Sequence, residues 1–219
     1  MNSSIGIIGG ADGPTAIYVT GSVGQTVLTA FLLLLAALAL GMLATKLLKK
    51  LTPFAVVGAA LVVAVDQYVK FLTVSALELG ETRPLLPGLF RLALVQNYGA
   101  AWSSLAGERW LLVAVTTVGL GVLAYLAVKI VRHPLGVWAL WLVIAGGIGN
   151  LIDRLRLGYV VDMIATEFIS FPVFNIADIF VTCGTVAAAI YYLKYYEKYD
   201  ANNWEKPNDG ADPSDNGNC

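Results

Sequence analysis

Five long apolar stretches restrict the possible folds of this chain more than any other feature of its sequence. They cover residues 23–45, 51–77, 110–128, 134–152 and 175–193. A helix of about 20 apolar residues is long enough to cross the hydrocarbon core of a bilayer. Charged residues make up only 13% of the chain, which is about half the share that is usual in soluble domains. The sequence therefore predicts an all-α integral membrane protein that folds as one compact helical bundle.

The basic residues between the apolar stretches predict how this bundle is oriented. If five helices alternate in direction, one side of the membrane receives eight Lys and Arg residues and the other side receives five. The larger set is Lys46, Lys49, Lys50, Lys129, Arg132, Lys194, Lys198 and Lys206, and the smaller set is Arg83, Arg91, Arg109, Arg154 and Arg156. Because cytoplasmic loops are enriched in Lys and Arg, the larger set is expected in the cytoplasm. The N-terminus and the loops 78–109 and 154–174 are then expected outside.

These two outer loops contain segments with the pattern of β-strands. "LFRLALVQN", residues 89–97, mixes β-branched and aliphatic residues with the polar residues Arg91 and Gln96, and it follows the turn-rich "RPLLPG". "LGYVVDMI", residues 157–164, has a similar pattern. Such patterns are typical of short strands between turns. A small extracytoplasmic sheet is therefore expected on the membrane surface, where it would help to shape a groove for an extended peptide.

Polar side chains occur inside or beside the apolar stretches, where they are costly. An Asp at the centre of a bilayer costs about 2.5–3.5 kcal/mol, so such residues normally face the bundle interior and have partners. They are Asp66, Gln67, Lys70, Asn97, Asn150, Asp153, Arg154, Asp162, Asn175 and Asp178. A spacing of four residues predicts an ion pair between Asp66 and Lys70 on one helical face. Asp153 and Arg154 are expected to be paired charges at a helix end.

Asp162 and Asp178 differ from the other acidic residues because neither has a cation within one helical turn. They are 16 residues apart, and the expected topology places both near the same membrane face. If they meet, the two carboxylates are expected to share one proton, because two ionised carboxylates at short range repel each other. That arrangement supports aspartic proteolysis. A proton or ion path lined by carboxylates is the alternative that spacing alone leaves open.

Several other functions find no support in the composition. The formal net charge of −1 gives no reason to expect a nucleic-acid partner. The chain has one histidine, His133, and two cysteines, Cys183 and Cys219. Without a cluster of Cys and His residues no zinc site is predicted, and a serine or cysteine triad lacks its base. We expect neither a metal nor another cofactor.

Five short motifs, in this order and at these spacings, resemble the motif blocks of lipoprotein signal peptidase (signal peptidase II). They are "DQYVK" (66–70), "NYGAAWS" (97–103), "GGIGNLIDR" (146–154), "YVVDM" (159–163) and "FNIAD" (174–178), and the resemblance covers about residues 55–195. It implies a four-helix transmembrane bundle in the bacterial plasma membrane, with its active site at the outer face. It also implies an aspartyl endopeptidase that cleaves prolipoprotein signal peptides before a cysteine carrying diacylglycerol. The expected partners are therefore these lipid-modified substrates and membrane lipids. One small departure is Trp102, where the family pattern more often has Phe.

The resemblance also implies roles for individual residues. The two catalytic aspartates fall on Asp162 and Asp178. The polar residues that surround the active site fall on Asp66, Lys70, Asn97, Asn150, Asp153, Arg154 and Asn175. Asn175 is then expected to hydrogen-bond to Asp178 and orient it.

The first 50 residues lie outside this resemblance. "SIGIIGGADGPTAIYVT", residues 4–20, resembles a segment of the β-subunit of sodium-translocating decarboxylases. We therefore divide the chain into an extension with one extra transmembrane helix (1–50), a signal peptidase II-like membrane domain (51–199) and a disordered polar tail (200–219). Two competing classes are a small ion-coupled membrane transport subunit, with Asp12 as an ion ligand, and a purely structural assembly factor.

Overall fold

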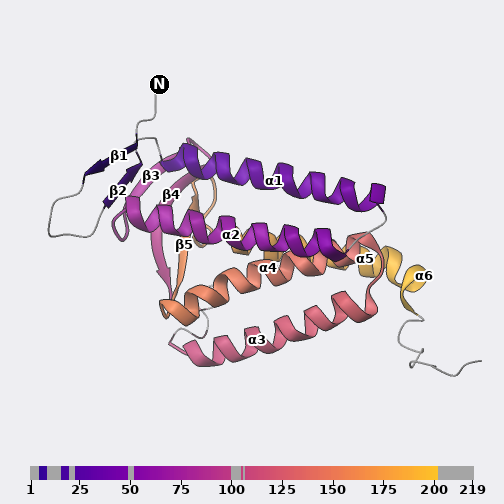
Figure 1. The fold of residues 1–219 in the computed structure, drawn as a ribbon. Helices are drawn as coiled ribbons and strands as arrows, with labels where there is room; N and C mark the ends of the chain where they lie inside the picture. Colours follow the sequence, from indigo (N-terminus) through magenta and orange to yellow (C-terminus); the bar gives the residue numbers. More distant parts are fainter. Residues whose placement is uncertain are drawn as a thin grey trace, which may run out of the picture.

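Five long helices form the body of the protein (Figure 1). The computed structural model describes residues 5–8, 16–19, 23–48, 52–99, 105 and 107–201. The helices are α1 (Val23–Leu48), α2 (Thr52–Ala76), α3 (Arg109–Tyr125), α4 (Pro134–Arg156) and α5 (Ile176–Tyr191). Within this part of the chain, five helices are long and apolar enough to cross a membrane. The predicted bundle of four helices with one extra N-terminal helix is confirmed.

The helix ends differ from the predicted ones in a way that affects the polar residues. Helix α4 begins with a proline in its first turn, where the missing N–H costs nothing, and it continues to Arg156. Asp153 and Arg154 therefore lie on its last turns. Helices α3 and α5 continue into the π-helical segments η2 (Leu126–Ile130) and η3 (Tyr192–Tyr196), and the short α6 (Glu197–Tyr199) follows η3.

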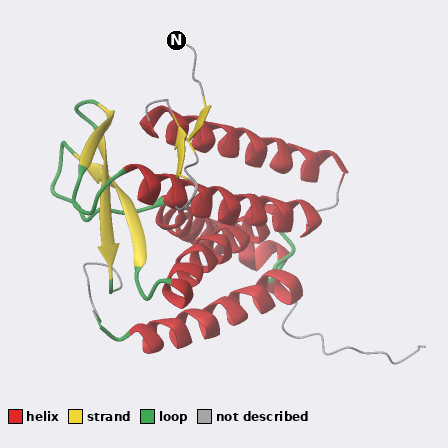
Figure 2. Cartoon of the chain, turned by 60° about the vertical axis from the view of Figure 1, so that its left-hand side comes forward, coloured by secondary structure: helices red, strands yellow, loops and turns green. Residues whose placement is uncertain are grey.

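A three-stranded antiparallel sheet lies at one end of the bundle (Figure 2). Its order is β3 (Thr82–Leu86), β4 (Phe90–Asn97) and β5 (Val160–Thr166). The two predicted strands, β4 and β5, are confirmed. Strand β3 was missed, because "RPLLPG" contains two prolines and was interpreted as a turn. Pro84 is tolerated because β3 is an edge strand. An edge strand has no neighbour on one side, so a proline whose missing N–H would point to that side removes no hydrogen bond from the sheet.

Helix α4 is the central element, since it packs against α2, α3 and α5. Two glycines allow this close packing. A Cβ on Gly146 would collide with the carbonyl oxygen of Ala177, and a Cβ on Gly149 would lie 2.6 Å from Asp66 Oδ2. Any larger residue would therefore push α4 away from α2 and from the first turn of α5.

The far end of the bundle corrects one boundary. Asp200, which the sequence assigned to the polar tail, is buried. Its carboxylate accepts hydrogen bonds from the backbone N–H groups of Arg132 and His133 and from the hydroxyl of Tyr191. The ordered body therefore extends beyond residue 199.

Two further strands, β1 (Ile5–Ile8) and β2 (Ala16–Val19), pair antiparallel ahead of α1. Both strands lie within residues 4–20, the stretch that resembles the decarboxylase subunit. Several residues used in the sequence predictions lie outside the described residues: Asp12, Lys49, Lys50, Trp102, Lys206 and Cys219.

Candidate active site

Asp162 and Asp178 line the same cavity. It has a volume of about 720 Å³ and lies between the sheet, the end of α4 and the start of α5; its polar lining residues also include Asn97, Asn150 and Arg154. Asp162 comes from β5 and Asp178 from the first turn of α5. Two carboxylates from separate segments therefore line one cavity.

Asp178 is stabilised by the start of its own helix. Asn175 is the N-cap of α5, and the two residues form a capping box. The Asn175 side-chain oxygen accepts a hydrogen bond from the Asp178 backbone N–H at 2.9 Å, and the Asp178 carboxylate accepts one from the Asn175 backbone N–H at 3.1 Å. A carboxylate in the first turn is also favoured by the helix dipole. Asp178 thus lies in the first turn of α5.

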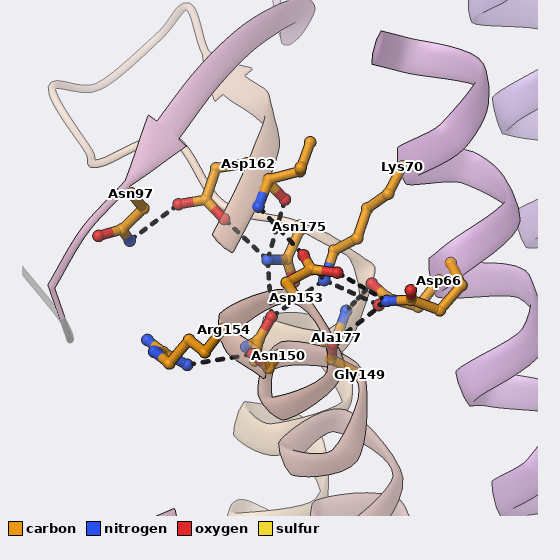
Figure 3. A network of polar contacts seen from close by, with 12 residues as sticks. Asp66, Lys70, Asn97, Gly149, Asn150, Asp153, Arg154, Asp162, Asn175 and Ala177 are labelled. Carbon is orange, nitrogen blue, oxygen red and sulfur yellow. Dashed lines mark hydrogen bonds and ion pairs between the residues drawn. The ribbon is translucent and has the colours of Figure 1, made fainter. Parts of the chain in front are cut away.

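Asn175 links the two carboxylates. Its side chain is fully buried, and its amide nitrogen donates to Asp162 Oδ1 at 2.7 Å and to Asn150 Oδ1 at 3.0 Å (Figure 3). The predicted hydrogen bond between Asn175 and Asp178 is present, through both the side-chain oxygen and the backbone N–H of Asn175. The bond from its side-chain amide nitrogen to Asp162 was not predicted. One residue therefore orients both acids.

Asp162 is almost completely buried, with 2% of its surface exposed. Asn97 on the neighbouring strand donates to Asp162 Oδ2 at 2.9 Å. Burial, and secondarily the negative charge of Asp178, raises the pKa of Asp162 to about 7, against the lowering effect of the Asn97 and Asn175 hydrogen bonds. A carboxyl group with such a pKa holds or releases a proton near neutral pH.

Lys70 is the centre of a buried polar cluster next to the two acids. Its ammonium group lies 2.9 Å from Asp66 Oδ2, 2.9 Å from Asp153 Oδ2 and 3.1 Å from Asn150 Oδ1. The predicted ion pair of Asp66 with Lys70 is confirmed. The predicted pairing of Asp153 with Arg154 is wrong, because adjacent residues on a helix point in different directions and Asp153 reaches α2 instead.

The two buried carboxylates around Lys70 also bind backbone groups next to the candidate acids. Asp66 Oδ1 accepts a hydrogen bond from the N–H of Ala177, which precedes Asp178. Asp153 Oδ2 accepts one from the N–H of Val161, which precedes Asp162. Lys70 is therefore linked through Asp66 to the backbone beside Asp178, and through Asp153 to the backbone beside Asp162 (Figure 3).

Asn150 has a single orientation that satisfies all its partners. Its side-chain oxygen accepts from Lys70 and Asn175, so its amide nitrogen faces Asp178 Oδ1, to which it donates at 2.8 Å. Arg154 stands beside it at the cavity wall. Its guanidinium donates to the Gly99 carbonyl at 2.8 Å and to the Asn150 carbonyl at 3.5 Å.

The site contains residues that the sequence analysis did not assign to it. Gln67 was noted only as a costly polar residue, yet its amide nitrogen donates to Asp153 Oδ1 at 2.9 Å and to the Gly149 carbonyl at 3.1 Å. The cavity wall along α5 includes Ile179, Thr182 and Cys183. The spacing of Thr182 from Asp178 was a usable signal, because residues four apart lie on one helical face.

No group of three or more His, Cys, Asp or Glu side chains within the described residues could hold a metal ion. His133 lies among tyrosines at the other end of the bundle, with its ring 4.4 Å from that of Tyr195. The absence of a metal and of other cofactors remains a prediction.

Comparisons with known proteins agree with this arrangement. A family model for signal peptidase (SPase) II matches residues 58–194. The lipoprotein signal peptidases of Streptococcus pyogenes serotypes M6 and M5 are each 45% identical to this chain over 139 residues, which is 62% of this chain and 90% of each relative. Two solved structures described as bacterial membrane enzymes are also similar. The first has a TM-score of 0.62 and is 30% identical, and the match covers 72% of this chain and 94% of the solved chain. The second has a TM-score of 0.61 and is 33% identical, and the match covers 64% of this chain and 93% of the solved chain.

Proposed function

Because this chain belongs to the signal peptidase II family, we propose that Asp162 and Asp178 are the catalytic carboxylates with which it removes signal peptides from prolipoproteins. The chain is a multi-pass bacterial membrane protein and an aspartic-type signal peptidase. The observation that carries the residue assignment is that both carboxylates line one cavity and are tied together by Asn175. The similar proteins give no support to the transport alternative.

The two acids are given different roles by their surroundings. Asp162 is the more deeply buried and has the raised pKa, so in our proposal it carries the shared proton. Ionised Asp178 takes a proton from a water molecule as the water oxygen attacks the peptide carbonyl carbon, and Asp162 donates its proton to the carbonyl oxygen. When the tetrahedral intermediate collapses, the C–N bond breaks, Asp178 passes its proton to the leaving amine, and one hydroxyl of the intermediate returns a proton to Asp162.

The remaining polar residues act on these two acids or on the substrate. In our proposal Asn97, Asn150 and Asn175 orient the carboxylates through the hydrogen bonds described above. Lys70, Asp66 and Asp153 fix the backbone beside them. Arg154 is the cation at the cavity wall, where it would face the peptide backbone of the substrate.

The substrate and the membrane orientation form the finer part of the proposal. The cavity continues from the polar site along apolar residues that include Phe171, Ile179 and Val181. We propose that a diacylglyceryl-modified cysteine enters from the outer leaflet, with its acyl chains in lipid and the scissile bond at the acids. The eight-to-five distribution of basic residues supports an outward-facing site. Labelling of cysteines introduced at residues 2, 48 and 206 is expected to find residue 2 outside and residues 48 and 206 inside.

The same proposal gives the domain organisation. Residues 51–199, together with the buried Asp200, form the peptidase domain. Residues 1–50 form an extension with one transmembrane helix, and the polar tail follows the peptidase domain.

Cleavage by the purified protein tests the proposal. In vesicles with a chelator present, the protein is expected to release the signal peptide from a diacylglyceryl-modified prolipoprotein. A substrate whose cysteine is replaced by serine, which cannot be lipidated, is expected to remain uncut. The double variant Asp162→Asn with Asp178→Asn is the matched blank. Equal cleavage by this double variant would remove both acids from the mechanism.

The pH dependence of cleavage is a second test of the assigned roles. Asp162 donates a proton only while it is protonated, so kcat/KM is expected to fall as the pH rises above about 7. The Asn97 hydrogen bond favours the ionised form of Asp162 and lowers its pKa. Asn97→Ala is therefore expected to raise this pKa and to move the alkaline limb of the pH profile to higher pH.

Gln96→Ala provides the control for this shift, because adjacent residues of a strand point to opposite faces. It is expected to leave the alkaline limb unchanged. An alkaline limb that stays in place in Asn97→Ala would argue against Asp162 as the proton donor.

A further inference from the structure

We infer that α1 is a positioning helix for the reaction: it holds the edge of the sheet and the flank of α5, and thereby the elements that carry the two acids. The family match begins at residue 58, so α1 lies outside it. The inference rests on the proposed function, because it concerns the placement of Asp162 and Asp178.

Helix α1 packs along the bundle through a narrow seam. Val27, Leu34 and Leu38 are 3%, 3% and 5% exposed, while most of the remaining side chains of α1 that the structure describes are partly or fully exposed. Their spacing of seven and four residues is that of one helical stripe. Leu38 also lies over Gly58 of α2, where a Cβ would come within 3.1 Å of the Leu38 side chain. The helix is therefore packed against the rest of the membrane domain along much of its length.

The start of α1 contacts the edge strand of the sheet. A Cβ built on Gly24 would lie 3.3 Å from the Pro84 carbonyl oxygen and 3.4 Å from the Leu85 side chain, both on β3. Leu85 is partly buried and packs against the same hydrophobic core that contains Val27. Figure 1 shows the first turns of α1 beside β3. Because β3 pairs with β4 and β4 with β5, this contact supports the sheet that carries Asn97 and Asp162.

A second contact reaches the helix of the other acid. The ring of Phe31 lies 6.4 Å from the ring of Phe180 on α5. Phe180 is buried, and its neighbours Ile179 and Val181 line the cavity. Helix α1 therefore touches both the sheet of Asp162 and the helix of Asp178. Movement of either element would change the distance between the two acids, and a displacement of about 1 Å can lower an enzymatic rate by about a hundredfold.

The full-length variant Gly24→Leu tests this role, since it places a bulky side chain at the contact with β3. We expect faster hydrogen exchange at the backbone amides of β3 and β4. We also expect kcat to fall about tenfold or more with little change in KM, because the displaced groups act in the chemical step. Thr29→Leu is the matched control, since it adds leucine to an exposed position of the same helix, and both readouts are expected to stay within about twofold of the wild type.

Each outcome bears on the inference. Unchanged exchange in β3 and β4 of Gly24→Leu would overturn it, and so would loosened strands with an unchanged kcat. If Gly24→Leu does not fold, Gly24→Ala replaces it; its Cβ requires a shift of only a few tenths of an ångström, and both readouts are expected to move in the same direction by a smaller amount. Hydrogen exchange reports on the packing whichever residues catalyse, so a failure of the proposed acids is distinguishable from a failure of this inference.

Discussion

Replacing Asp178 by Asn is expected to lower the kcat of signal-peptide cleavage by about 10³–10⁴-fold. The new amide has nearly the same shape as the carboxylate, so its oxygen would still accept a hydrogen bond from the Asn175 backbone N–H. It cannot, however, take a proton from the attacking water. Asp162→Asn is expected to give a similar loss, because an amide has no acidic proton to donate to the substrate carbonyl. Single-turnover cleavage of a diacylglyceryl-modified prolipoprotein measures both effects.

Folding has to be separated from chemistry in this experiment. Loss of the negative charge at the start of α5 is expected to destabilise the protein by only about 1 kcal/mol, so Asp178→Asn is expected to unfold at nearly the wild-type temperature. Glu167→Gln is the matched acid-to-amide control. Glu167 accepts a hydrogen bond from Gly88 at the other end of the sheet, and this variant is expected to retain full activity. Cleavage by Asp178→Asn at more than about a tenth of the wild-type rate would contradict the assignment.

The helices and the two inner strands could be predicted because their patterns depend on local sequence. An apolar stretch of membrane length has few alternatives to a helix. Short runs of aliphatic and β-branched residues between turns mark β4 and β5 even without their neighbours. Strand β3 could not be predicted in this way, because Pro84 favours a turn locally and only its edge position in the sheet makes it acceptable.

The partners of the polar residues depended on packing between distant segments. Asp66 and Lys70 are on one helix, so their spacing was sufficient. Asp153 binds a lysine 83 positions earlier in the chain, and no local pattern indicates such a partner. Asp200 is similar: its surroundings in the sequence are polar, yet it is buried against the segment before α4. The set of polar residues was therefore predictable, while the direction of several hydrogen bonds was not.

Replacing Lys70 by Met is expected to have the largest effect on stability. The ion-pair and hydrogen-bond partners of Lys70 described above are Asp66, Asp153 and Asn150, and neither proposed catalytic carboxylate is among them. Its ammonium group is buried between Asp66 and Asp153, so its removal leaves two buried carboxylates without their shared cation. Loss of one member of such a buried arrangement typically costs about 3–5 kcal/mol. Chemical denaturation in detergent micelles is expected to show a loss of this size.

Activity is expected to fall together with stability. Asp66 and Asp153 hold the backbone N–H groups of Ala177 and Val161, and repulsion between the two carboxylates would displace both. Lys70 also fixes the orientation of Asn150, which donates to Asp178. Cleavage by the folded fraction of Lys70→Met is therefore expected to be at least about a hundredfold slower.

Two further variants separate charge balance from the loss of a side chain. Arg83→Met is the matched control. The Arg83–Glu81 pair also has a 2.8 Å contact, but it lies on the surface, with 49% of the Arg83 side chain and 34% of the Glu81 side chain exposed. Because exposed ion pairs contribute little to stability, little change is expected. Adding Asp66→Asn to Lys70→Met removes one of the two uncompensated charges and is expected to restore part of the stability. It is not expected to restore the activity, because no cation remains to orient Asn150. A Lys70→Met variant as stable as the wild type would show that the cluster of Lys70, Asp66 and Asp153 does not hold the two acids in place. Their positions would then depend only on the capping box of α5 and on the pairing of β4 with β5.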